Sequence, residues 1–174
     1  MPGSSPLYYW DACLFLAWLK DEERNLGEMD GVRELIARCR RGEVKIMTSV
    51  LTSVEVLAAR IPVGMDTHFA GLMKRISRAN VDTKVASLAH DLRNHYARKG
   101  GKNLSAPDAI HLATAVHYRA DELHTFDEVG SRRSLGLIPL SGDVGGHKLR
   151  ICKPVARHPQ LDLRKPTSLG DANN

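Results

Sequence analysis

Four acidic side chains lie where the sequence is expected to pass between a strand and a helix: Asp11, Glu55, Asp108 and Asp127. The first and the last follow apolar, strand-like runs, and the other two lie near the starts of expected helices. In an open α/β sheet, the carboxyl ends of the strands and the neighbouring helix starts border one crevice. We therefore expect the four carboxylates to meet in that crevice.

Four carboxylates in one crevice repel one another, and each resists ionisation. A hard divalent cation removes this conflict, and Mg²⁺ or Mn²⁺ suits carboxylate and water ligands better than any His or Cys set in the chain. Such a metal lowers the pKa of a bound water and neutralises charge on a phosphodiester under in-line attack. The set therefore predicts metal-dependent phosphodiester hydrolysis, with one or two metal ions.

Each acid also has a purely structural interpretation. The segments TSVE and SAPD, which end at Glu55 and Asp108, both match the capping box [ST]-x-x-[DE]. Asp127 can cap the turn that follows it, and Asp11 can cap the helix that follows it. Asp11 is the hardest to explain in this way, because it lies in an apolar stretch where an unpaired charge is costly. Only the whole set, meeting in one crevice, favours the functional interpretation.

The elements that would position these acids alternate along the chain. Strand-like runs are expected at residues 7–10, 44–50, 80–82, 123–126 and 136–140, and helical spacing lies between them, including a helix capped by Ser105. Each connection is long enough for a crossover, which predicts a mostly parallel sheet of four to five strands with helices on both faces. The fold class is therefore α/β, a three-layer α/β/α sandwich.

Composition limits the classes of protein that fit. A chain of 174 residues with 43% hydrophobic and 26% charged residues is typical of one globular domain. Aromatic residues make up only 5%, which disfavours recognition of bases by aromatic stacking, while the net charge of +5 permits a polyanionic partner. The apolar segment 7–19 is too short to span a bilayer.

The three cysteines are an odd number without CxxC spacing, which favours free thiols in a reducing compartment over disulfides or a zinc site. The histidines His111, His117 and His124 are too irregularly spaced for a zinc set. No basic region precedes the first apolar segment, so we expect no signal peptide and a cytoplasmic protein.

The C-terminal part of the chain differs in composition. Residues 142–174 contain six Lys or Arg residues against three Asp, and long apolar runs are absent. We therefore divide the chain into a nuclease-like domain, residues 1–141, and a basic C-terminal extension, residues 142–174. The extension is interpreted either as a solvated surface wrap or as an electrostatic clamp for nucleic acid.

Four segments, in this order and spacing, resemble the acidic motifs of the PIN-domain family: YYWDACLFLAWL, TSVLTSVEVL, LSAPDAIHLATA and HTFDE. The resemblance covers about residues 7–140, and the best-known small members of the family are VapC-type toxins of toxin–antitoxin pairs. It implies an α/β/α metal-dependent ribonuclease that cuts RNA, forms a homodimer and meets a small antitoxin protein. Carried over, it makes the four acids the Mg²⁺ or Mn²⁺ ligands, helped by two small polar residues, Ser49 and Thr125.

The chain departs from the family pattern at two places in the site. Cys13 stands where many relatives carry Asn or Ser, and Glu128-Val-Gly follows the last acid where relatives often show a phenylalanine. The main alternative is a catalytically inactive PIN-like module that binds RNA or a partner protein. A response-regulator-like or hydrolase α/β domain with an aspartyl nucleophile is a second alternative, but it needs a Lys or Thr arrangement near Asp11 that we do not find.

Overall fold

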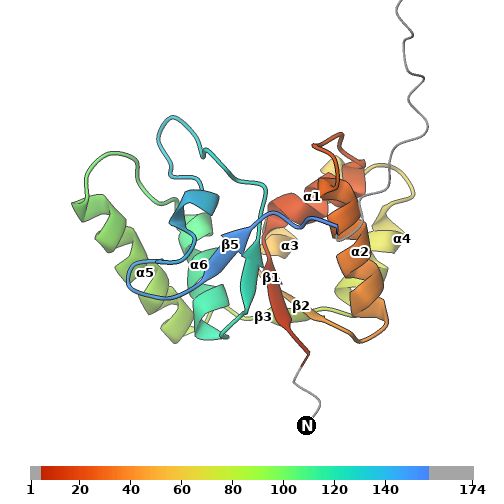
Figure 1. Ribbon diagram of the computed structural model, residues 1–174, viewed down its shortest axis with the longest axis horizontal. Helices are drawn as coiled ribbons and strands as arrows, with labels where there is room; N and C mark the ends of the chain where they lie inside the picture. Colours follow the sequence, from red (N-terminus) through yellow and green to blue (C-terminus); the bar gives the residue numbers. More distant parts are fainter. Residues whose placement is uncertain (1–4, 157–174) are drawn as a thin grey trace, which may run out of the picture.

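Five parallel strands form the sheet of this protein, in the order β3-β2-β1-β4-β5 (Figure 1). The structure is a computed structural model and describes residues 5–156. The strands are β1 (Leu7–Trp10), β2 (Lys45–Ser49), β3 (Ser77–Ala79), β4 (Glu122–His124) and β5 (Arg150–Cys152). The helices are α1 (Ala12–Lys20), α2 (Glu28–Arg40), α3 (Thr52–Glu55), α4 (Asp66–Met73), α5 (Thr83–Arg98) and α6 (Ala106–His117), with 3₁₀ turns η1 (Ala58–Arg60) and η2 (Ile138–Leu140).

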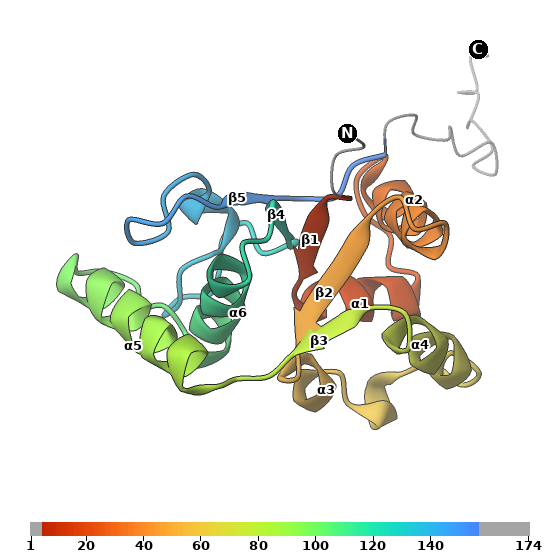
Figure 2. The ribbon, with the colours of Figure 1, turned by 90° about the horizontal axis from the view of Figure 1, so that it is seen from below.

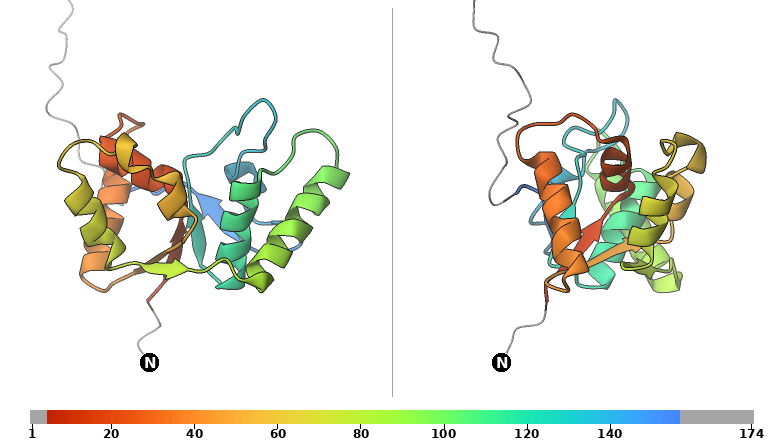
Figure 3. Two further views of the ribbon diagram at one scale, coloured as in Figure 1. Left: turned by 180° about the vertical axis from the view of Figure 1, so that it is seen from behind. Right: turned by 90° about the vertical axis from the view of Figure 1, so that its right-hand side faces the viewer.

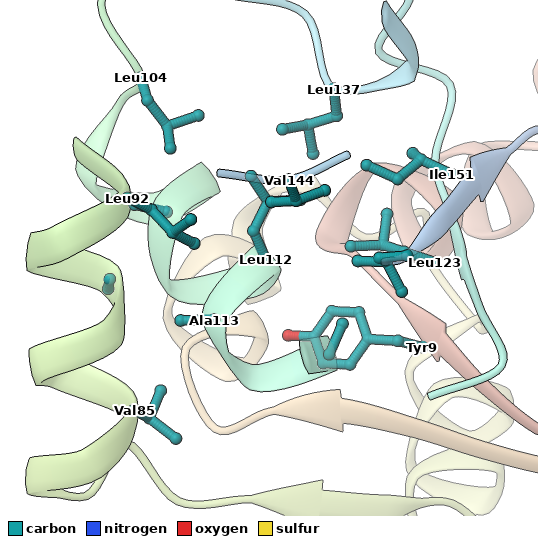
Figure 4. Packing of buried hydrophobic residues seen from close by; sticks show 14 of the residues in the cluster. Tyr9, Val85, Leu92, Leu104, Leu112, Ala113, Leu123, Leu137, Val144 and Ile151 are labelled. Atoms are coloured by element: carbon teal, nitrogen blue, oxygen red, sulfur yellow. The ribbon is translucent and has the colours of Figure 1, made fainter. Parts of the chain in front are cut away.

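Helices cover both faces of the sheet, with α5 and α6 on one side and α1, α2 and α4 on the other (Figure 2). The alternation of side chains along β1 divides the core in the same way. Tyr9 packs with Leu112 and Leu123 on the α5–α6 side (Figure 4), while Trp10 packs with Phe15 on the other. The predicted three-layer α/β/α fold is confirmed.

Short polar residues cap the starts of three of the helices. Asp11, directly after β1, accepts a hydrogen bond from the Cys13 amide and caps α1. Ser105 caps α6 through the Asp108 amide, and Asp82 caps α5 through the Val85 amide. These short side chains satisfy amide groups that a helix start would otherwise leave unpaired.

Two strand predictions were wrong. The third strand is Ser77–Ala79 rather than residues 80–82, because Asp82 at that position already serves as the N-cap of α5. The expected fifth strand at residues 136–140 is instead a bend that ends in the 3₁₀ turn η2. Pro139 lies in this turn, and a proline has no amide hydrogen to give to a strand ladder.

The fifth strand lies in the segment that we assigned to the basic extension. β5 pairs in parallel with β4, and Val144, Leu149 and Ile151 are buried in the same core as α5 and α6 (Figure 4). Residues 142–156 are therefore part of the sheet domain, and the division at residue 141 does not separate them from it. Residues 157–174 lie outside the described part of the chain.

Two further expectations concern the whole chain. None of the helices between residues 5 and 156 is long and apolar enough to cross a membrane. All three cysteines, Cys13, Cys39 and Cys152, are free thiols, as predicted.

The burial of β5 leads to a stability prediction. Ile151→Ala should lower the free energy of unfolding by about 2–5 kcal/mol, because it opens a cavity in the core. The matched control is Val155→Ala, since Val155 is 61% exposed and its loss should change stability by no more than about 0.5 kcal/mol. Urea unfolding of the two variants measures this difference. Equal, small effects would mean that residues 142–156 lie on the domain without supporting it.

Candidate active site

The four predicted acids lie along the edge of the sheet that is formed by the carboxyl ends of its strands, where the neighbouring strands β2, β1 and β4 end. Asp11 directly follows β1, Glu55 ends the short helix that follows β2, and Asp127 lies three residues after β4. Asp108 is in the first turn of α6. The connection into α6 and the loop after Asp127 rise at this same end of the molecule (left view of Figure 3). The edge therefore brings together the elements that carry all four carboxylates.

Asp11 is buried, with 6% of its surface exposed, and its carboxylate is held by three donors. The amide and the thiol of Cys13 donate to Oδ1 at 3.1 and 2.8 Å, and the Thr125 hydroxyl donates to Oδ2 at 2.5 Å. Burial raises the pKa of the Asp11 carboxyl, and these hydrogen bonds and nearby His111 oppose the rise. Burial and Asp11 together raise the pKa of the Cys13 thiol, which therefore stays a donor.

Thr125 links Asp11 to Asp127. Its hydroxyl oxygen also accepts a hydrogen bond from the Asp127 amide, at 3.0 Å. The Asp127 carboxylate in turn accepts the amides of Gly130 at 2.9 Å and Leu137 at 3.2 Å, and so holds the two ends of the loop that follows it. One threonine thus fixes the spacing between the first and the last acid.

Asp108 shows the electrostatic conflict that the sequence suggested. Burial raises the pKa of the Asp108 carboxyl, the hydrogen bond from the Ser105 hydroxyl opposes the rise, and the charges of Asp127 and Glu55 add to it. His111 lowers this pKa and also that of Asp11. Asp127 and Glu55 are therefore close enough to Asp108 to oppose its ionisation, and His111 lies near Asp11, Asp108 and Glu55.

Glu55 does not act as a helix cap. Its Oε2 is 2.8 Å from Nε2 of His111, a residue with only 2% exposure on α6. Nδ1 of His111 is 2.7 Å from the hydroxyl of the fully buried Tyr9. The capping interpretation of the segment TSVE is wrong, because α3 has no side-chain cap and the Thr52 hydroxyl pairs with that of Thr48 at 2.6 Å.

The other three acids combine both interpretations. Asp11 caps α1, Asp108 shares a hydrogen bond with the cap of α6, and Asp127 closes a turn. These structural contacts aim the carboxylates at the same edge of the sheet. Capping and metal binding therefore need not exclude each other here.

The donor set suits Mg²⁺ or Mn²⁺, which prefer oxygen ligands. No three of the four carboxylates have oxygen atoms that all lie within 4.8 Å of one another. Mg²⁺ commonly keeps several waters and binds only one or two carboxylates directly, so a hydrated ion fits carboxylates that are further apart. Burial and the charges of Asp127 and Glu55 together oppose the ionisation of Asp108, and a cation would relieve this conflict.

A second group of possible metal ligands lies elsewhere on the sheet. Glu122, His124 and Cys152, on β4 and β5, have donor atoms within 4.8 Å of one another. However, the Trp10 indole donates to Nδ1 of His124 at 3.2 Å, so the ring proton is on Nε2, which donates to Glu122 at 2.8 Å. A metal would need the Nε2 lone pair. The hydrogen bonds therefore explain this group better than a metal does.

The sequence analysis did not identify Tyr9 and His111 as site residues. It did predict Ser49, whose hydroxyl contacts the backbone and none of the four acids. Tyr9 and His111 were not connected with the acids, although His111 follows Asp108 by three residues and so shares its helix face. Ser49 is fully buried, and its hydroxyl accepts the Leu51 amide at 3.1 Å in the turn before α3. Its contribution to the site is to shape that turn.

The chain as a whole is similar to known proteins. The sequence matches the PIN domain over residues 8–133. The chain belongs to the PIN-domain family. At the level of the family, this places the chain among nucleases. No curated protein in the comparison matches the sequence.

Solved structures share the PIN fold. A toxin–antitoxin complex from Klebsiella pneumoniae has 18% identity and a TM-score of 0.55, over 84% of this chain and 97% of that one. FitAcB from Neisseria gonorrhoeae has 17% identity and a TM-score of 0.53, over 84% and 97%. VapBC2 from Rickettsia felis, bound to a DNA fragment from its promoter, has 14% identity and a TM-score of 0.53, over 68% and 86%. At these identities, the likeness establishes the fold.

Asp108→Asn tests whether the site holds unfavourable charge. Because the pKa of Asp108 is raised on folding, the native protein loses stability as the pH rises from the ordinary carboxyl range through the folded pKa. Asn cannot ionise, and Ser105 can still cap α6 through the backbone amide of residue 108. The stability of the variant relative to wild type should therefore increase across this pH window and then level off in urea unfolding curves. An equal loss of stability at every pH would assign Asp108 to capping alone.

Proposed function

We propose that this PIN-domain protein is an Mg²⁺- or Mn²⁺-dependent endoribonuclease, the toxin of a toxin–antitoxin pair. The observation that carries the proposal is the gathering of four carboxylates at one sheet edge, where burial and the charges of Asp127 and Glu55 raise the pKa of Asp108. Membership in the PIN family supports the nuclease chemistry. The structures of toxin–antitoxin complexes with the same fold support the toxin assignment.

The residues have separate tasks in this proposal. Asp11, Glu55, Asp108 and Asp127 hold the metal. A bound divalent ion would supply an activated water and charge neutralisation at the phosphodiester. Thr125 fixes Asp11 relative to Asp127, and the Cys13 thiol donates to Asp11 where many relatives have Asn or Ser. No separate protein base is required.

Two loops beside the acids offer a surface for the RNA strand. Residues 99–104 and 128–136 are joined by backbone hydrogen bonds, from Asn103 to the Arg133 carbonyl at 3.1 Å and from Leu135 to the Asn103 carbonyl at 3.0 Å. We define the basic rim as the exposed cations on these loops, Lys99, Lys102, Arg132 and Arg133. Within residues 5–156, none of them forms an ion pair with a carboxylate. These charges are therefore available to phosphates.

The clamp interpretation of the C-terminal segment has less support. Lys153 is 2.8 Å from Glu28 and 2.7 Å from Glu128, and Arg150 is 3.2 Å from Glu122. Both cations thus neutralise acids of their own domain, while Lys148 is exposed. The remaining basic residues, Arg157, Arg164 and Lys165, lie outside the described part of the chain. We accordingly place the main RNA contacts on the basic rim.

The remaining parts of the proposal concern assembly and location. A small antitoxin partner is supported by the toxin–antitoxin complexes among the similar structures. A homodimer follows from the family resemblance. A cytoplasmic location follows from the free thiols and from the RNA substrate.

Asp11→Asn tests the catalytic proposal. Cleavage of single-stranded RNA should require Mg²⁺ or Mn²⁺ and should fall by at least about a hundredfold in the variant, because substitutions one shell further from a metal already cost 10–100-fold. The control is Asp66→Asn, an exposed acid at the start of α4, which should leave the rate unchanged. Gel-resolved cleavage rates measure both. RNA binding without any cleavage by the wild type would instead favour the inactive PIN-like module.

A second experiment locates the RNA-binding surface. Changing Lys102, Arg132 and Arg133 together to Ala should weaken RNA binding and lower the salt dependence of log affinity by up to about 2, since each phosphate contact contributes about 0.7 for single strands. The matched comparison changes Lys148, Arg150 and Lys153 to Ala. Fluorescence anisotropy in EDTA, where cleavage does not interfere, measures both slopes. A larger loss of salt dependence in the comparison variant would mean that the C-terminal segment, rather than the basic rim, makes the main phosphate contacts.

A further inference from the structure

Beneath Glu55 lies a buried hydrogen-bond chain that runs from Tyr9 through His111 to the Glu55 carboxylate. We propose that Tyr9 and His111 are positioning residues, which fix the orientation of Glu55 as a metal ligand. The inference rests on the proposed metal site but makes a separate claim about how one ligand is held. Nδ1 of His111 is 2.7 Å from the Tyr9 hydroxyl and Nε2 is 2.8 Å from Glu55. Both rings are buried, with 0% and 2% exposure.

The direction of this hydrogen-bond chain follows from which of its groups can donate a proton. Burial, together with the charge of Asp11, raises the pKa of the Tyr9 hydroxyl well above its ordinary value, so Tyr9 keeps its proton. A carboxylate only accepts hydrogen bonds, so Nε2 of His111 must carry the proton that faces Glu55. In neutral His111, Nδ1 is then an acceptor, and the Tyr9 hydroxyl is the donor that stabilises this tautomer.

The neighbouring hydroxyl groups leave this arrangement undisturbed. Thr48 donates to the Trp10 carbonyl at 2.7 Å, and Thr114 donates to the Ile110 carbonyl at 2.6 Å. Both lie close enough to Tyr9 to affect its pKa. Because their protons are engaged elsewhere, neither threonine donates to Tyr9, and Nδ1 of His111, at 2.7 Å, is the hydrogen-bond partner of the Tyr9 hydroxyl.

Glu55 depends on this chain because its own segment does little to hold it. α3 has four residues and no side-chain cap, and its Ser53 and Val54 are exposed. Among the described residues, His111 is the side chain that donates a hydrogen bond to the Glu55 carboxylate. That bond uses Oε2, which leaves Oε1 for another partner. His111 also lies one turn after Asp108, so α6 places one ligand directly and a second through its histidine.

The first test separates the hydrogen bond from the bulk of the ring. His111→Leu removes the donor and should weaken Mn²⁺ affinity by about 10–100-fold, as expected for a group that orients a metal ligand. His111→Gln keeps an N–H donor on a side chain of similar reach and should retain most of the affinity. Thermal stabilisation by Mn²⁺, read from unfolding of the full chain, gives the affinity without requiring activity. Equal affinities in wild type and His111→Leu would overturn the proposal.

A double-mutant cycle tests whether His111 acts through Glu55. Glu55→Gln should itself weaken Mn²⁺ binding, and adding His111→Leu to it should produce no further loss of affinity. Additive losses would mean that His111 affects the metal by another route, which contradicts the positioning role.

Tyr9→Phe tests the end of the hydrogen-bond chain that lies furthest from Glu55, with Tyr96→Phe as the matched control. Tyr96 belongs to the same buried cluster, but its hydroxyl contacts the Asp143 carbonyl at 3.5 Å rather than a histidine. Nitrogen NMR of the histidine rings should show His111 with its proton on Nε2 in wild type and in Tyr96→Phe, and a weakened preference in Tyr9→Phe. A proton on Nδ1 instead of Nε2 in wild type would contradict the proposed hydrogen-bond chain. This readout needs no metal. A wild type that binds no Mn²⁺ would therefore refute the proposed function, while the NMR result would still show whether the hydrogen-bond chain from Tyr9 to Glu55 exists.

Discussion

The burial of Asp11 is the constraint on which the arrangement of the site depends. A carboxylate with 6% exposure at the end of the central strand is tolerable only if donors surround it. The donors come from two places: Cys13 in the first turn of α1, and Thr125 directly after β4. The second donor requires β4 to lie beside β1, in the register that pairs Trp10 with His124. Satisfying one acid therefore fixes the contact between the first strand and the strand that leads to Asp127.

The acids that would hold a metal also perform the local work of starting helices and closing turns. This double use has a geometric cause, because the carboxyl ends of parallel strands and the helix starts beside them are the same region. A helix start favours an acidic side chain through its unpaired amides and its dipole, whether or not a ligand is bound. Glu55 is the exception, since no cap contact holds it and a histidine on another helix takes that role.

The sequence predicted the features that depend on local pattern. β1, α1, the inward face of α5 and the capped start of α6 follow from apolar spacing and from cap residues such as Ser105. β5 was missed because three residues at a sheet edge carry almost no local signal, and Arg150–Cys152 becomes a strand only through its pairing with β4. The link between His111 and Glu55 was missed for a similar reason. The two residues are 56 positions apart, and only the packing of α6 against β2 brings them together.

Each face of β1 carries a hydrogen-bond chain of an aromatic residue, a histidine and a glutamate. The two glutamates differ in the charged groups around them. Trp10 donates to His124, which donates to Glu122, just as Tyr9 connects to His111 and Glu55. Glu122, however, also meets Arg150, and together with His124 this cation lowers the pKa of its carboxyl. Its charge is thereby neutralised within the protein.

Among the described residues, Glu55 has no Lys or Arg partner, and its charge instead raises the pKa of Asp108. An arginine thus pairs with the glutamate on one face of the strand, whereas no Lys or Arg within residues 5–156 pairs with the glutamate on the other. A glutamate that is held in place but not neutralised by a Lys or Arg is what a cation site requires, and the contrast between these two hydrogen-bond chains favours the proposed cation site at Glu55 over one at Glu122.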